Sequence, residues 1–351
     1  MAESNAFKTL EEKDIVSTRT LLHEAIPLTG AIASGTYGDT NIKNPPHGMF
    51  QSVYDYPYLS SSANHIFDIT VGVSSNSSHY GTSNTQAAKK KNVYNQMAQL
   101  LVGYDVTGSI MRFDEDGDLT GGDKYDEVIV MPFSRLLVKD EIKKGTFSLT
   151  LGTNAVYRGS SAYTDTITIT DSSGSDGYFV NSPVGEYGVL FGSGSFMTGS
   201  TTAPVGLLYY QAGIAVFTKD IFSGSVHPNN VQLSPSGELI DDMLTGSNIE
   251  AIADGFRNRL VNVQFNNTTE LNSTIYFCRA NHNEFNYSTN PTYVDGSKIR
   301  VKTNSTDEPI AYITSIGLYN DKNELMATAK LSEPLRKSPS TEFTLRARLD
   351  Y

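Results

Sequence analysis

The 351-residue sequence contains one cysteine, Cys278, and no tryptophan. A single cysteine cannot form an internal disulfide or a cysteine-based zinc cage, which excludes disulfide scaffolds and zinc fingers. No window approaches the roughly 20 apolar residues of a membrane-spanning helix, and the first residues lack the apolar core of a secretion signal. We therefore expect a protein that is made in the cytoplasm and has no membrane partner.

Basic residues are also scarce, with 27 lysines and arginines against 38 aspartates and glutamates, a net charge of −11. The largest basic cluster is the three lysines at 89–91. This balance argues against a nucleic-acid partner, because phosphate backbones attract basic surfaces. The charged fraction is only 19%, and uncharged polar residues fill the difference. We interpret the abundant Tyr, Ser, Thr and Asn as contact surface against protein partners.

Apolar residues mostly alternate with polar ones, the pattern of half-buried β-strands. The last nine residues show it best, because Phe343, Leu345, Ala347, Leu349 and Tyr351 share one face. Together with runs at 311–319 and 324–331, this segment predicts a C-terminal meander of three strands. We predict a mainly β fold, an antiparallel β-sandwich that is jelly-roll-like or related.

Two short amphipathic helices interrupt the β pattern. One is expected at residues 84–102, and a second after Ser247, which forms an S-x-x-E capping box with Glu250. Residues 159–203 are rich in Gly, Ser and Thr, and their strand-like islands favour ordered β structure over a flexible linker. The predicted organisation is an extended N-terminal arm (1–60), a first part of the sandwich (61–158), a β excursion or insertion (159–203) and a second part (204–351).

An acidic run, DEDGD at 114–118, is the densest cluster of chemically active side chains. Calcium binds six to eight oxygen ligands, which carboxylates on a tight loop supply. EF-hand spacing fails, however, because Leu119 and Tyr125 occupy the positions of the required glycine and glutamate. An acidic connection between strands is therefore the favoured interpretation, and calcium the alternative. The candidate ligands would be Asp114, Asp116, Asp118 and Asp123.

Motifs for catalysis or cofactor binding are missing. The six histidines form no HExxH pair, and the glycines form neither a P-loop nor a dinucleotide-binding fingerprint. Ser193 lacks the strand-turn-helix context of a nucleophile elbow. We therefore expect a protein that is not an enzyme and has no catalytic residue and no cofactor-binding residue.

Two aromatic tracts are candidate protein interfaces, because tyrosine offers a large, stiff contact area with a polar tip. The alternative is that they pack on the protein's own sandwich. The candidates are Tyr54, Tyr56 and Tyr58 in the first tract, and Phe285, Tyr287 and Tyr293 in the second.

Three segments carry a resemblance to a known family: NVYNQMA at 92–98 running on to Gly103, FSRLLVKDEIKKG at 133–145, and IGLYND at 316–321 through AKL at 329–331. They resemble virion structural proteins of tailed bacteriophages, chiefly the large contractile-tailed phages of cyanobacteria. The resemblance implies a non-enzymatic subunit of the tail or baseplate, located in the virion after assembly in the host cytoplasm. Its partners would be other virion structural proteins and copies of itself. The alternatives are a neck or head decoration protein, or an adhesin whose aromatic loops bind host-surface glycan.

Overall fold

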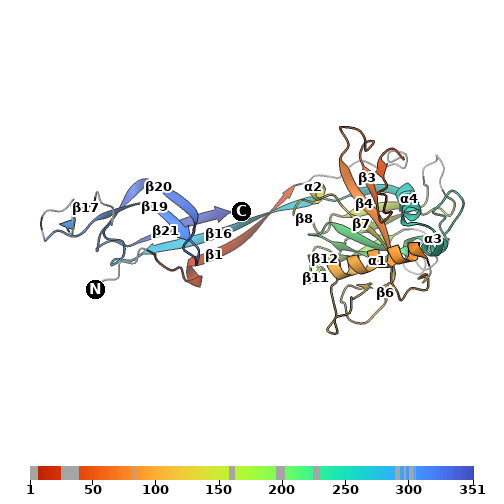
Figure 1. Cartoon of the computed structure of the whole chain (residues 1–351), viewed down its shortest axis with the longest axis horizontal. Helices are drawn as coiled ribbons and strands as arrows, with labels where there is room; N and C mark the ends of the chain where they lie inside the picture. Colours follow the sequence, from red (N-terminus) through yellow and green to blue (C-terminus); the bar gives the residue numbers. More distant parts are fainter. Residues whose placement is uncertain are drawn as a thin grey trace. The chain divides into compact units, whose positions relative to one another are not determined.

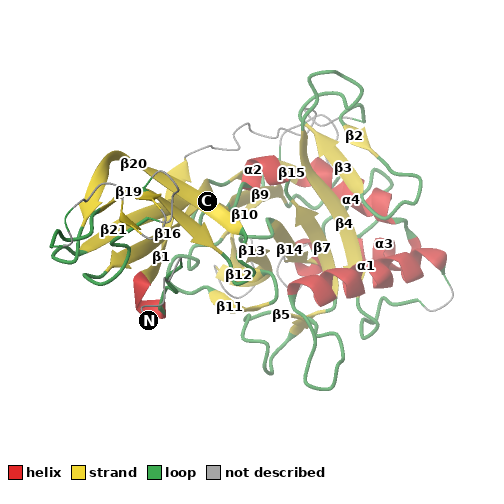
Figure 2. Ribbon diagram, turned by 60° about the vertical axis from the view of Figure 1, so that its left-hand side comes forward, coloured by secondary structure: helices red, strands yellow, loops and turns green. Residues whose placement is uncertain are grey.

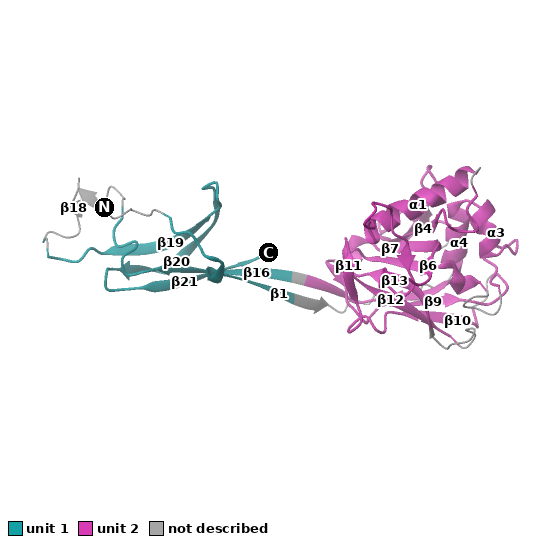
Figure 3. Ribbon diagram, turned by 90° about the horizontal axis from the view of Figure 1, so that it is seen from below, with its two compact units in different colours: residues 1–21, 270–351 teal, residues 22–269 magenta. Residues whose placement is uncertain are grey.

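The computed structural model describes residues 7–24, 39–81, 84–157, 163–194, 202–223, 230–288, 293–295, 298–299, 304 and 306–351. Within it the chain forms two compact units, which Figure 3 colours separately. Unit 1 combines the two ends of the chain, Met1–Leu21 and Glu270–Tyr351, whereas unit 2 is the continuous segment Leu22–Thr269.

Unit 2 is built around a large antiparallel sheet (Figures 1 and 2). Its described strands are β2 (Ile42–Lys43), β3 (Gln51–Tyr54), β4 (His65–Val73), β7 (Glu127–Pro132), β9 (Ser148–Gly152), β10 (Thr166–Thr170), β11 (Phe179–Ser182), β12 (Gly185–Ser193), β13 (Thr202–Tyr209), β14 (Ile214–Thr218) and β15 (Leu260–Gln264). Neighbours follow the order β15-β9-β10-β12-β13-β14-β7-β4-β3-β2, and β11 pairs with β12. The mainly β, antiparallel class predicted from the alternation is therefore confirmed.

Both faces of this sheet carry apolar clusters. Residues 128–131 of β7 (Val-Ile-Val-Met) alternate between a first cluster on one face and a second on the other. Successive side chains of a strand point to opposite faces, so a strand that is covered on both sides is a continuous apolar run. Within the first cluster, the Phe133 ring contacts the rings of Phe147 and Phe265 at 5.9 and 5.0 Å. These contacts join strands far apart in the sheet order, so the sheet curves around this cluster.

The helices of unit 2 are α1 (Thr85–Leu101), α2 (Arg135–Val138), α3 (Ile240–Gly246) and α4 (Ile249–Arg259), with a 3-10 helix η2 (Lys219–Phe222). The first predicted helix is confirmed as α1, where the Asn84 side chain accepts the Gln86 N–H at 2.9 Å. The predicted capping box is wrong. Asn248 is the N-cap of α4 and accepts the Ala251 N–H, while Ser247 ends α3. The amide oxygen of asparagine satisfies that donor as well as a serine hydroxyl does.

Unit 1 contains a sheet in the order β1-β16-β21 and a separate β19–β20 hairpin. The 3-10 helix η1 (Glu12–Asp14) precedes β1. The strands are β1 (Ile15–Glu24), β16 (Asn267–Ala280), β17 (Val294–Asp295), β18 (Lys298–Ile299), β19 (Ala311–Tyr319), β20 (Leu325–Lys337) and β21 (Phe343–Asp350). The first residues of β16, Asn267 and Thr268, belong to unit 2, where they pair with β8 (Glu141–Ile142). In β21 the burial alternates as the sequence predicts, with Ala347 buried and its neighbours exposed.

The predicted three-stranded meander is wrong in its third strand. β19 and β20 form the expected hairpin, but β21 pairs with β16, which places Phe343 opposite Ala280. β20 also continues through Pro334 instead of turning there. Proline has no N–H for the ladder, and it is accommodated because the pairing of the two strands shifts register beside it.

The domain boundaries predicted from composition also differ from those of the structure. The predicted arm (1–60) is divided between the units, because Gln51–Tyr54 pairs with β4 and is largely buried in the unit 2 sheet. The predicted excursion (159–203) supplies β10, β11 and β12 to the same sheet, where Thr-Ile alternation pairs β10 with β9. The predicted second part (204–351) is split between Thr269 and Glu270.

Candidate functional site: an acidic loop and its cavity

The acidic run forms a loop between two short paired strands of unit 2. We call residues 115–123 the acidic loop; it joins β5 (Phe113–Asp114) to β6 (Lys124–Tyr125). Gly117 and Gly122 have φ angles of 82° and 66°, in the left-handed region that glycine adopts without steric cost. The sequence therefore turns where its glycines permit, and the predicted acidic connection between strands is confirmed.

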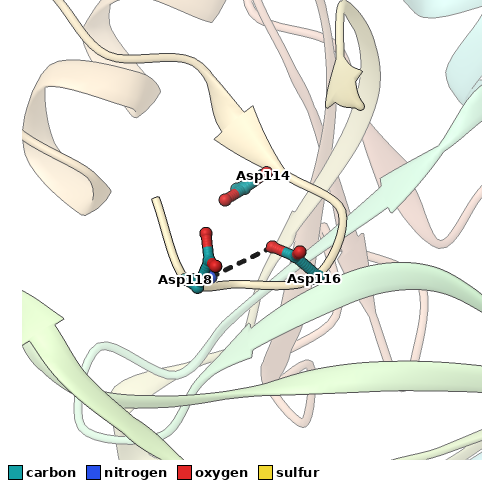
Figure 4. A group of neighbouring side chains, drawn as sticks. All are labelled: Asp114, Asp116 and Asp118. Atoms are coloured by element: carbon teal, nitrogen blue, oxygen red, sulfur yellow. Dashed lines mark hydrogen bonds between the residues drawn. The ribbon is translucent and has the colours of Figure 1, made fainter. Parts of the chain in front are cut away.

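Three carboxylates of this region lie close together (Figure 4). Asp114, Asp116 and Asp118 each present an oxygen within 4.8 Å of the others, whereas Asp123 does not belong to the group. Protein groups already compensate the buried member, because the Lys124 ammonium lies 2.6 Å from Asp114 Oδ1 and the Leu119 N–H donates to Asp114 Oδ2. The spacing is compatible with a metal ion, but these contacts serve the loop itself.

Burial and hydrogen bonding shift the carboxylate pKa values in opposite directions. Burial raises the pKa of Asp114, although the nearby Lys124 ammonium opposes the effect. Hydrogen bonds from the Thr120 N–H and hydroxyl lower the pKa of the exposed Asp118. The exposed side of the loop therefore keeps its negative charge most firmly, while the buried side is neutralised by an internal cation.

Two tyrosine hydroxyls anchor the loop to the rest of unit 2. The Tyr94 hydroxyl of α1 donates to the Tyr125 carbonyl at 2.7 Å and accepts the Phe113 N–H at 3.4 Å. The Tyr187 hydroxyl of β12 donates to the Gly117 carbonyl at 2.7 Å. Because α1 holds both short strands and β12 holds the turn, the position of the loop depends on segments that are distant in sequence.

A cavity of about 560 Å³ lies beside the loop. Five of its lining residues are acidic and two are basic, so their formal net charge is −3. The lining residues are Arg112, Glu115, Gly122, Asp123, Lys124, Tyr125, Asp126, Glu127, Ala203, Pro204, Thr218 and Asp220.

Some of these charges are internally paired. Both oxygens of Asp126 accept from Arg112 at 3.0 Å, and Glu127 Oε1 lies 3.2 Å from His79 Nδ1. By contrast, among the described residues no side-chain hydrogen bond or ion pair reaches Glu115 or Asp123. Burial and the neighbouring carboxylates raise the pKa of Glu115. The cavity therefore has uncompensated negative charge, which favours a cationic ligand.

The cavity was not predicted from the sequence. Glu115 belongs to the acidic run and Glu127 follows it at the start of β7, but their convergence with Asp220 depends on η2, which begins almost a hundred residues later. No local sequence pattern identifies Asp220 as a cavity residue. Its carboxylate accepts the Ser223 hydroxyl at the end of a short helical turn, which is an ordinary structural role for an aspartate. Only the pairing of β14 with β7 brings these segments together.

The predicted interface aromatics fall in different units. In unit 2, Tyr56 and Tyr58 are 58% and 39% exposed, and the half-buried Tyr54 contacts the Tyr58 ring at 6.2 Å. In unit 1, Phe285 and Tyr287 are 38% and 49% exposed, whereas the Tyr293 hydroxyl is buried. Tyr293 itself is half-buried, so all six residues are at least partly exposed, and their role as interfaces stays a prediction.

A further carboxylate gives unit 2 a pH dependence that can be measured. Asp171 is fully buried and accepts the Gly145 and Phe147 N–H groups at 2.7 and 2.9 Å, and burial raises its pKa to about 6. A raised pKa in the folded state means that stability is lost as pH rises through 6. From pH 7 to pH 5, the wild-type protein should gain about 1 kcal/mol of unfolding free energy relative to Asp171→Asn. Urea denaturation at both pH values checks this, and a pH-independent difference would contradict it.

Comparison of the chain with family models, with curated proteins and with solved structures finds no match. In the part of the chain that the structure describes, no helix has the length and apolar character needed to cross a membrane.

Proposed function

We propose that this protein is a non-enzymatic structural subunit that assembles through unit 1 with further copies of itself. The observation that carries the proposal is that the described residues of unit 1 form no core of large apolar side chains. The resemblance to virion structural proteins of tailed phages supports placing the assembly in a virion, with the tail or baseplate as the first location to examine. Other virion proteins would then contact the completed assembly.

Unit 1 buries too little apolar surface to be stable by itself. Of the 103 residues of unit 1, the buried apolar residues in the described part are three alanines: Ala280, Ala311 and Ala347. Both apolar clusters of the structure lie in unit 2. A segment of about 100 residues normally needs a core of large apolar side chains to offset the conformational entropy lost on folding. Unit 1 therefore requires a partner surface.

Large apolar side chains are exposed on unit 1 instead. Of the exposed large apolar residues described, 11 lie in unit 1 and 10 in unit 2, although unit 2 has 248 residues. In the β19–β20 hairpin, Tyr312 and Met326 are 60% and 68% exposed. Residues that face each other across the two strands of this hairpin are only half-buried, as in the pairs Leu318 with Ala327 and Ile313 with Leu335. Exposure of this density marks surfaces that are covered in an assembly.

The charge distribution favours a second copy as the partner. Unit 1 has 13 basic and 14 acidic residues, a net charge of −1, whereas unit 2 has 14 and 24, a net charge of −10. Copies can therefore approach through unit 1 with little repulsion while their unit 2 parts repel one another. Sheet faces that pack between copies would also form the predicted β-sandwich, with the layers coming from different chains.

The test is the oligomeric state of the full chain, measured by native mass spectrometry and sedimentation at micromolar concentrations. We expect the wild-type chain to form an oligomer and Leu318→Asp to shift it to monomers, because a charge buried between copies is strongly unfavourable. The matched control is Thr314→Asp on the exposed side of β19, which should assemble normally. Thermal unfolding of unit 2, followed in parallel, should be the same in all three proteins. A monomeric wild-type chain, or dissociation by Thr314→Asp to the same extent, would contradict the proposal.

A further inference from the structure

One edge of the β19–β20 hairpin in unit 1 is suited to pairing with another strand. Among the described residues, β19 pairs with β20 and with no other strand, so its second edge is open. An open edge presents a row of backbone N–H and C=O groups that lack a strand partner, and proteins usually protect such edges with charged residues or proline. The nine residues of β19, AYITSIGLY, include neither. They are rich in aromatic and β-branched residues, which favour strands.

The other long edge strands of unit 1 do carry this protection. β20 contains Pro334 and four charged residues. In the separate sheet, β1 at one edge carries Arg19, and β21 at the other edge carries Arg346 and Arg348. Charges and proline on an edge strand discourage pairing with another chain. An unprotected edge beside protected ones therefore indicates that β19 is covered in the assembled protein.

We propose that β19 pairs antiparallel with β19 of a second copy, across a two-fold axis. This inference rests on the proposed assembly through unit 1, and it names the segment that joins two copies. A two-fold interface uses the same segment of both chains, so a charged strand would bring like charges together. Because β19 has no charged residue, pairing with itself costs no such repulsion.

The register that pairs all nine residues of β19 places Ser315 directly opposite Ser315 of the second copy. Thr314 then lies opposite Ile316 of the second copy, and Tyr312 opposite Leu318. Pairs of aromatic and aliphatic side chains across two strands stabilise a sheet. The two hairpins together form a sheet of four strands, whereas a hairpin alone is marginally stable in water. The joined sheet still presents the half-buried side chain of Leu318, so edge pairing and face packing between copies are compatible.

The test is disulfide cross-linking of the full chain, with Cys278→Ser as the background so that each variant has one cysteine. Ser315→Cys is expected to give a covalent dimer on mild oxidation, because directly opposite residues have Cα atoms about 4.5–5.5 Å apart, within reach of a disulfide. Lys330→Cys is the matched control, since Lys330 is exposed and pairs with Ser315 within the hairpin. In the proposed sheet the two β20 strands are three strand spacings apart, about 14 Å, so this variant should stay monomeric under denaturing conditions.

A second variant tests the pairing without a cysteine. Ser315→Asp places two like charges directly opposite each other and should weaken assembly several-fold at low salt, measured by sedimentation. Thr314→Asp lies opposite Ile316 and should assemble as the wild-type chain does.

The outcomes separate edge pairing from assembly in general. If the wild-type chain is oligomeric but Ser315→Cys gives no cross-link and Ser315→Asp assembles normally, edge pairing is wrong while assembly through unit 1 stands. Equal cross-linking of the Ser315→Cys and Lys330→Cys variants would reflect random collision or contact between faces, and it would also overturn edge pairing. A monomeric wild-type chain would overturn both proposals.

Discussion

Replacing Arg259 by methionine is expected to lower the unfolding free energy of the protein by about 4 kcal/mol, measured by urea denaturation. Arg259 is the last residue of α4 and is fully buried. Burial lowers the pKa of its guanidinium to about 10, so it is still charged at neutral pH. Among the described residues, no carboxylate is paired with it. Its donors instead reach the backbone carbonyls of Gly152, Asn154, Val156 and Gln232, at 2.5–3.4 Å.

The size of this effect follows from what methionine leaves behind. Methionine can fill much of the space of the arginine stem, but it satisfies none of the four carbonyls. Each buried acceptor that loses its donor costs about 1–3 kcal/mol, and water that enters recovers part of this. The same guanidinium also ties the segment after β9 to Gln232 before α3, so its loss loosens two connections at once.

Arg135→Met is the matched control, because Arg135 donates to one carbonyl, that of Gln211, from an exposed position on α2. Its loss should change the unfolding free energy by less than about 1 kcal/mol, since water replaces an exposed donor. Arg259→Lys should fall between the two, because lysine keeps the charge but has fewer donors. If Arg259→Met were as stable as Arg135→Met, the buried hydrogen bonds would not stabilise the fold as argued.

Replacing Gly72 by alanine is expected to destabilise the protein by about 2 kcal/mol, a fall of roughly 4–8 °C in the midpoint of thermal unfolding. Gly72 lies in β4 directly beneath α1, and a Cβ atom there would stand 2.9 Å from Tyr94 Cα. That neighbour is helix backbone, so the clash is relieved only by moving α1 away from the sheet. The same movement would disturb the Tyr94 hydroxyl that holds both strands of the acidic loop.

The control for this substitution is Gly246→Ala at the end of α3. No atom lies within 4 Å of a Cβ at Gly246, its φ is not in the left-handed region, and the residue is exposed. Alanine there should be neutral or slightly stabilising, because it restricts the unfolded chain and suits a helix. Equal midpoints for the two alanine variants, by differential scanning calorimetry, would show that the helix does not depend on this close approach.

The sequence pattern alone was sufficient to predict those elements that depend mainly on residues close to them in the chain. The α1 helix follows from an apolar stripe between Asn84 and Gly103, and the turn of the acidic loop follows from its glycines. The alternation in β21 correctly separates its half-buried and exposed faces. These predictions succeed because period and turn chemistry act over a few residues, whatever the chain does elsewhere.

Which strands pair, and which distant residues come together, could be decided only from the tertiary structure. Nothing in β21 distinguishes β16 from β20 as its neighbour, since both alternate with the same period. The composition of residues 159–203 resembles that of a loop. In the structure, however, β10 and β12 each have a hydrogen-bonded neighbouring strand along both edges in the large sheet of unit 2. The division into two units was also missed, because unit 1 joins segments from opposite ends of the chain.

The sequence by itself determined an acidic, mainly β protein, because charge and alternation are properties of residues in order. Only the tertiary structure decided where the charge and the apolar surface lie. It collects −10 of the −11 net charge in unit 2 and lines an open cavity there with Glu115 and Asp220, which no local signal connects. It also leaves the described residues of unit 1 without a core of large apolar side chains. Burial depends on which segments meet, and that is settled only when strands distant in sequence pair.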